Sequence, residues 1–105
     1  MLDMKPWEIW YARVKFEDTD EIKSRPVVVL ETGEVAVIAL KVTGHEERNY
    51  YGDIDITYWQ SAGLTKPSTI RAGIKLVLDY SAFERKVGVL QYIDRINVLK
   101  ALPEY

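Results

Sequence analysis

The chain has 105 residues, 48% of them hydrophobic, and this length suits one compact domain over residues 1–105. It contains no cysteine, which excludes a disulfide framework, a thiolate metal site and a cysteine nucleophile. A formal net charge of -2 and a pI near 5.4 argue against a protein that coats nucleic acid through bulk positive charge, so any contact with nucleic acid must be local.

The N-terminal segment has no apolar stretch of the kind that a signal peptide needs, and no apolar run reaches membrane-spanning length. No repeat, low-complexity tract or linker interrupts the chain. We therefore expect a cytoplasmic protein with no membrane partner.

The first half of the chain predicts three strands. Residues 8–16 alternate, with Trp10 and Val14 on one face and Tyr11 and Arg13 on the other, which is typical of a half-buried strand. The polar run 17–24 predicts an exposed loop. Residues 26–30 and 35–40 are apolar on both faces, and the turn 31–34 between them contains Gly33, which can adopt a positive φ. We predict a central hairpin that is buried on both sides.

The middle of the chain predicts a short helix and a long strand. Thr57 and Gln60 fit a capping box and Gly63 fits the position just after a helix, so a helix of one to two turns is expected here. Residues 69–78 alternate again. The side chains expected to face inward are Ile70, Ala72, Ile74, Leu76 and Leu78, and those expected to face outward are Thr69, Arg71 and Lys75. This strand is predicted to carry a basic stripe.

The C-terminal part predicts a turn or short helix over 81–84, a short strand over 86–90 and an amphipathic helix over 91–102. Ile93, Ile96 and Leu99 lie on one side of that helix. Many short strands with helices added late favour an α+β, mainly β fold built on a small barrel.

Five segments follow one another in a recognisable order. They are Trp7-Glu-Ile-Trp10, Lys23-Ser-Arg25-Pro26 before a Val-rich strand, a strand that ends near Thr43, the run from Ala62 to Arg71, and Arg85-Lys-Val-Gly88-Val-Leu90 before the last helix. In this order and spacing the chain resembles the MazF/PemK/Kid family of toxins from type II toxin–antitoxin systems, over nearly its whole length.

The resemblance implies an SH3-like barrel, the fold that this family shares with CcdB. It also implies an mRNA interferase: a metal-independent endoribonuclease that cleaves single-stranded RNA, needs no cofactor and works as a homodimer. A cognate MazE-like antitoxin with an acidic, disordered tail is the implied partner. We expect this tail over Arg25 and the Arg71–Lys75 stripe, and the dimer interface beside the active-site edges, near Tyr50, Tyr51 and Trp59.

RNA cleavage without a metal uses the 2′-hydroxyl as nucleophile, and it needs a proton acceptor, charge stabilisation at the phosphoryl oxygens and help for the leaving 5′-oxygen. The resemblance implies Arg25 and Thr43 as the catalytic pair. Arginine stays protonated, so Arg25 suits charge stabilisation better than proton acceptance. The base is left open, and His45, two residues beyond Thr43, is our hypothesis for it.

The expected register separates the catalytic pair. With a turn centred on Thr32-Gly33, Arg25 lies opposite Leu40, and Thr43 lies about 10 Å further along the strand. A bulge or a bent edge must close that gap.

Four cations are candidate RNA-binding residues: Lys23, Arg48, Arg71 and Lys75. The resemblance places Arg71 where some family members use an arginine for RNA, while an ordinary solvated face is the alternative. Gly73 stands where those members have an aspartate, so their acid/base arrangement cannot be carried over. No metal site is predicted. Two other classes stay open: a non-catalytic CcdB-like toxin that binds a protein target, and a plain SH3-like interaction module.

Overall fold

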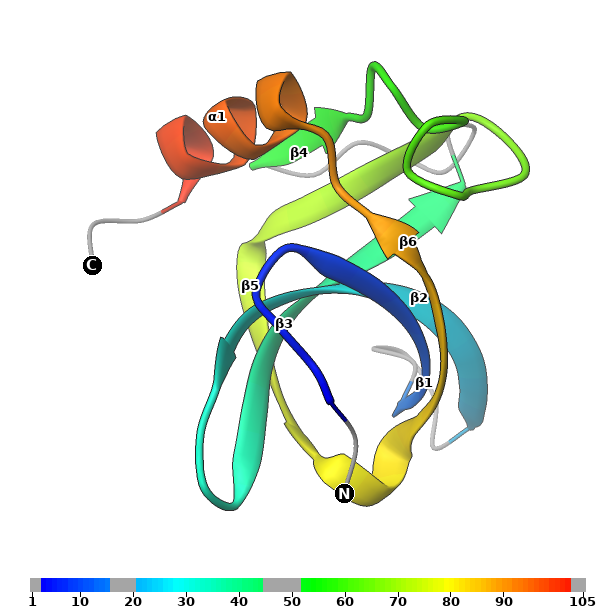
Figure 1. The fold of residues 1–105 in the computed structure, drawn as a ribbon, viewed down its shortest axis with the longest axis vertical. Helices are drawn as coiled ribbons and strands as arrows, with labels where there is room; N and C mark the ends of the chain where they lie inside the picture. Colours follow the sequence, from blue (N-terminus) through cyan, green and yellow to red (C-terminus); the bar gives the residue numbers. More distant parts are fainter. Residues whose placement is uncertain (1–2, 16–20, 45–51, 103–105) are drawn as a thin grey trace.

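The computed structural model describes residues 3–15, 21–44 and 52–102, which form an antiparallel sheet and a C-terminal helix (Figure 1). The strand order in the six-stranded sheet is β4-β5-β3-β2-β1-β6. The elements are β1 (Glu8–Lys15), β2 (Ile22–Thr32), β3 (Ala36–Gly44), β4 (Asp53–Asp55), β5 (Ser68–Asp79), the 3₁₀ turn η1 (Tyr80–Ala82), β6 (Phe83–Val89) and α1 (Tyr92–Ala101). The predicted α+β, mainly β class is confirmed.

The sheet curls until side chains from distant strands share one core. Phe83 of β6 and Leu76 of β5 both pack into a cluster with Val27 and Val29 of β2, although β5 and β6 are separated by three strands in the sheet order. Figure 1 shows β1, β2, β3, β5 and β6 bending around this region. We call the face that carries this cluster the inner face.

A second core covers the outer face of the same strands. It contains Val28 of β2, Leu40 and Val42 of β3, and Val98 of α1. Because side chains of β2 and β3 enter both clusters, the predicted hairpin buried on both sides is confirmed.

The hairpin turn lies further along the chain than predicted. Thr32 pairs with Val37, and the Gly33 N–H donates to the Ala36 carbonyl at 2.9 Å, so Glu34 and Val35 occupy the turn. Gly33 is not among the positive-φ glycines, so its conformational freedom was a misleading signal. The predicted turn centre at Thr32-Gly33 is therefore wrong, and every pairing derived from it moves.

Two further predicted segments need correction. Residues 22–24 were predicted as loop, but they begin β2 and pair with Lys15, Val14 and Arg13; because all three are exposed, they show no apolar alternation. The segment 57–63 forms consecutive turns instead of a regular helix. Its capping box is absent, because the backbone N–H groups of Thr57 and Tyr58 donate to the Asp94 carboxylate at 2.8 and 2.9 Å.

The end of that segment was predicted correctly. Gly63 has φ 96°, its N–H donates to the Gln60 carbonyl, and the Leu64 N–H donates to the Trp59 carbonyl. These two hydrogen bonds form a Schellman motif, which needs a glycine at this position.

Helix α1 packs through a different face from the one predicted. Asp94 and Val98 are its buried residues, whereas Ile93 and Leu99 are exposed. The buried side of α1 contains Asp94, because its carboxylate accepts hydrogen bonds from the backbone of the turn that begins at Thr57. Within the described residues, no helix is long and apolar enough to cross a membrane.

Candidate active site

The observed register brings Arg25 and Thr43 together. Val27 pairs with Lys41, and continuing this register by two residues places Arg25 opposite Thr43. In this extended register no offset along the strand remains between the two residues, in contrast to the separation that the predicted turn implied. The late turn accounts for this shift, and a one-residue bulge between Val29 and Glu31 sets the final register.

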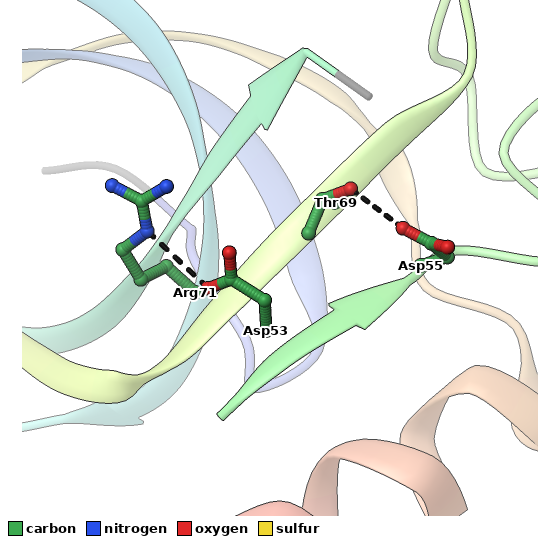
Figure 2. A network of polar contacts seen from close by, with 4 residues as sticks. All are labelled: Asp53, Asp55, Thr69 and Arg71. Atoms are coloured by element: carbon green, nitrogen blue, oxygen red, sulfur yellow. Dashed lines mark hydrogen bonds and ion pairs between the residues drawn. The ribbon is translucent and has the colours of Figure 1, made fainter. Parts of the chain in front are cut away.

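This pair belongs to a row of polar residues across four strands. Thr43 pairs with Thr69 of β5, and Thr69 pairs with Asp55 of β4. The hydroxyl of Thr69 donates to Asp55 Oδ1 at 2.8 Å, along the dashed line in Figure 2. The row therefore runs from a cation through two hydroxyls to a carboxylate.

A second row lies beside the first on the same face. Lys41 pairs with Arg71, and Arg71 pairs with Asp53. The Nε atom of Arg71 lies 3.3 Å from Asp53 Oδ1, and both side chains are only 5% exposed (Figure 2). This buried ion pair links the short strand β4 to β5, next to the row that contains Thr43, Thr69 and Asp55.

The predicted outward stripe of Arg71 and Lys75 is wrong. Between Leu40 and Lys41 of β3, the partner in β5 jumps from Lys75 to Arg71, so β5 bulges there. Leu40 and Lys41 point to opposite faces, and therefore their partners Lys75 and Arg71 do so as well. Arg71 is 4% exposed, whereas Ile74, predicted to face inward, is 49% exposed.

A pocket of about 170 Å³ opens where β2 begins and β3 ends. Arg25 and Thr43 both line it. The other residues around it are Tyr11, Ser24, Pro26, Val42, Gly44, Leu64, Thr65, Lys66 and Ser68. None of these lining residues within the described part of the chain is acidic, so the pocket suits an anionic group.

The other predicted site residues lie apart from this pocket or outside the described residues. Lys23 is exposed on β2, 3.8 Å from Glu21, and Lys75 is exposed on β5. His45 and Arg48 lie outside the described residues. Among the described residues, no group of three or more His, Asp or Glu side chains is placed to hold a metal ion.

Sequence reasoning missed Lys66 as a pocket residue. Its segment served only as a landmark of the resemblance, because a lysine before a proline carries no signal of its own. Its position depends on how the loop after β4 returns to β5 past the end of β3, which alternation along one strand cannot indicate. Tyr11 was missed for a simpler reason, since it reads as one more outward residue of β1.

Comparison with solved structures gives the chain the fold of MazF toxins. The Mycobacterium tuberculosis toxin MazF-mt6 is similar with a TM-score of 0.70 and 21% sequence identity, over 90% of this chain and 91% of that chain. An endoribonuclease in complex with its cognate antitoxin from Mycobacterial species is similar with a TM-score of 0.72 and 13% identity, over 92% of this chain and 88% of that chain. No protein-family model and no curated protein sequence matches the chain.

Proposed function

We propose that this protein is the toxin of a type II toxin–antitoxin system, an endoribonuclease that cleaves single-stranded RNA without a metal ion. The 2′-hydroxyl loses its proton and attacks the adjacent phosphorus, and the bond to the 5′-oxygen breaks, so that the 5′-oxygen leaves and takes up a proton. The observation that carries the proposal is the placement of Arg25 beside Thr43 at one pocket, on the fold of MazF toxins. Identity at this level supports the fold, so the activity rests on the geometry of the pocket.

Each residue of the pair has a defined task in this proposal. The guanidinium of Arg25 binds two phosphoryl oxygens of the scissile phosphate and stabilises the negative charge that grows in the transition state. The Thr43 hydroxyl hydrogen-bonds the phosphate or the 2′-oxygen. Neither residue is a good proton acceptor at neutral pH, since arginine stays protonated and a hydroxyl is a weak base.

His45 stays our hypothesis for the proton acceptor. It follows Thr43 by two residues, and an imidazole exchanges a proton near neutral pH. We expect His45→Ala to slow cleavage roughly 10²-fold or more and to remove an inflection of the rate between pH 5 and 8. A wild-type profile that is flat in this range, or little rate loss in His45→Ala, excludes His45 as the base.

The pocket favours the nuclease over a non-catalytic CcdB-like toxin or an SH3-like interaction module. A protein that only binds another protein has no need of an arginine and a hydroxyl set together in a pocket without acidic lining residues. Incubation of the purified protein with a long single-stranded RNA in EDTA separates the three. The proposal expects cleavage products, and intact RNA under these conditions contradicts a metal-independent nuclease.

The remaining parts of the proposal concern partners. We place the protein in the cytoplasm as a homodimer, with its interface beside the active-site edges, and sedimentation that shows only monomer at micromolar concentration contradicts this. We also propose an antitoxin whose acidic tail covers Arg25 and competes with RNA. The similar endoribonuclease bound to its antitoxin supports such a partner. Lys23, Arg48 and Lys75 remain candidates for RNA binding, whereas the buried Arg71 is assigned to the frame of the site.

A further inference from the structure

Lys66 lies against the end of β3 that carries the catalytic threonine. Its Nζ atom is 3.6 Å from the position that a Cβ atom on Gly44 would occupy, and Gly44 directly follows Thr43. The loop between β4 and β5 brings it there. A glycine at position 44 leaves the space beside the backbone to the lysine side chain.

Lys66 approaches β3 from the opposite side of the sheet to the row of polar residues that contains Thr43 and Thr69. Successive residues of a strand point to opposite faces, so the positions of Thr43 and Gly44 face opposite sides of the sheet. The row through Thr43 and Thr69 continues the inner face, whereas Lys66 approaches Gly44 from the outer one. Cations therefore stand on both sides of the end of β3.

The ammonium group of Lys66 is available to an anion, whereas two serine hydroxyls of the pocket donate within the protein. Ser68 Oγ donates to the Lys66 carbonyl at 2.9 Å, which fixes the loop, and Ser24 Oγ donates to Glu84. The side chain of Lys66 makes no hydrogen bond or ion pair within the described part of the chain. It is exposed, so a ligand can reach it.

The volume of the pocket limits the size of the group that can bind beside the Lys66 ammonium group. Sites for drug-sized ligands measure roughly 300–1,000 Å³, and this pocket is about 170 Å³. It therefore takes part of a nucleotide. A lysine binds phosphate as a point charge, which suits a phosphate that must be held without being polarised for reaction.

From this geometry we infer that Lys66 is a substrate-positioning residue that binds an RNA phosphate next to the one that is cleaved. The inference rests on the proposed function, because it assigns the scissile phosphate to Arg25 and Thr43. An RNA strand that crosses the end of β3 is then held at two successive phosphates, by Arg25 on one side and by Lys66 on the other.

The test measures binding of a single-stranded oligonucleotide whose 2′-O-methyl sugars prevent cleavage, as a function of salt concentration. Lys66→Ala should weaken binding roughly tenfold, as expected for a lost charge-assisted hydrogen bond. The slope of log K against log salt should fall by about 0.7, the value for one phosphate contact on a single strand. Lys66→Arg should restore most of the affinity and the slope. Lys100→Ala, which removes an exposed lysine from the last turn of α1, should leave both unchanged.

Cleavage kinetics on ordinary RNA distinguish failure of this inference from failure of the proposed function. Loss of a substrate-positioning residue in Lys66→Ala should raise KM roughly tenfold and leave kcat nearly unchanged. If the wild type cleaves RNA but Lys66→Ala has the wild-type slope and KM, the role of Lys66 is overturned and the nuclease stands. If the wild type neither cleaves nor binds, both are overturned. Thermal melting of Lys66→Ala should match the wild type, and a large loss of stability also counts against a role in binding.

Discussion

The inner face of the sheet is apolar at one end and polar at the other, although the same strands carry both ends. Along β2 the inner face passes from Val29 and Val27 to Arg25, and along β3 it passes from Ala39 to Lys41 and Thr43. The apolar end is the core of the curled sheet, and the polar end carries Arg25 and Thr43 of the candidate site. The site thus inherits its geometry from strands that the core holds in place, so changes at the two ends should have different consequences.

The largest expected effect lies at the apolar end. Phe83 is buried and meets Trp10 edge to face, with ring centroids 6.3 Å apart. Phe83→Ala should lower the free energy of unfolding by about 3–5 kcal/mol, because it removes a large buried side chain and leaves a cavity. Denaturant unfolding measures this loss. A loss of RNA cleavage by this variant while it remains folded and stable contradicts the division between the two ends.

The next largest effect is expected at the polar end, where the carboxylate of Asp53 should contribute to stability. Asp53→Ala should cost about 3 kcal/mol, since it removes a carboxylate that pairs with the buried guanidinium of Arg71. Asp55→Ala is the matched control: it removes an exposed aspartate of the same strand and should cost about 1 kcal/mol through the lost Thr69 hydrogen bond. Equal losses of unfolding free energy in the two variants show that the Arg71–Asp53 ion pair stabilises the fold no more than the Thr69–Asp55 hydrogen bond does.

The smallest effect concerns a polar group within the apolar end. Desolvation acts to raise the pKa of Glu8, but hydrogen bonds from the Trp10 side chain, the Lys5 backbone and Lys86 outweigh it and hold this pKa below 4.5. A carboxyl group with a lowered pKa in the folded state adds stability above its unfolded pKa, and the contribution is lost as the pH falls through the folded pKa.

Glu8→Gln should therefore reduce the loss of unfolding free energy between about pH 6 and pH 3 by less than about 1 kcal/mol, and the melting temperature should depend less on pH over this range. Thermal melting of both proteins across this range measures it. The same fall in melting temperature for the variant and the wild type removes Glu8 from the acid response.

The sequence predicted the strands well because alternation in β1 and the apolar runs of β2 and β3 report burial directly. It failed where a tertiary contact decides the structure. The position of the hairpin turn was wrong because a glycine permits a positive φ without requiring one. The bulge in β5 reversed the faces of Arg71 and Lys75, and burial on both sides of its first half left no alternation that marks the change.

The candidate site divides in the same way. Arg25 and Thr43 came from the resemblance and are adjacent in the structure, yet the predicted register held them apart. Lys66 and the Arg71–Asp53 pair depend on how β4 and its following loop return to β5. No local pattern encodes that return, so neither was predicted.

Cleavage by Arg25→Lys tests the central claim most directly, because it separates a shaped phosphate clamp from a positive charge. Lysine keeps the charge but loses the planar fork that binds two phosphoryl oxygens. A time course on single-stranded RNA in EDTA should show cleavage slowed roughly 10²-fold or more, comparable to the loss of one preorganised donor in an oxyanion site. The melting temperature should stay close to that of the wild type, since Arg25 is only partly buried. Cleavage at nearly the wild-type rate by a folded Arg25→Lys protein contradicts the catalytic role of Arg25.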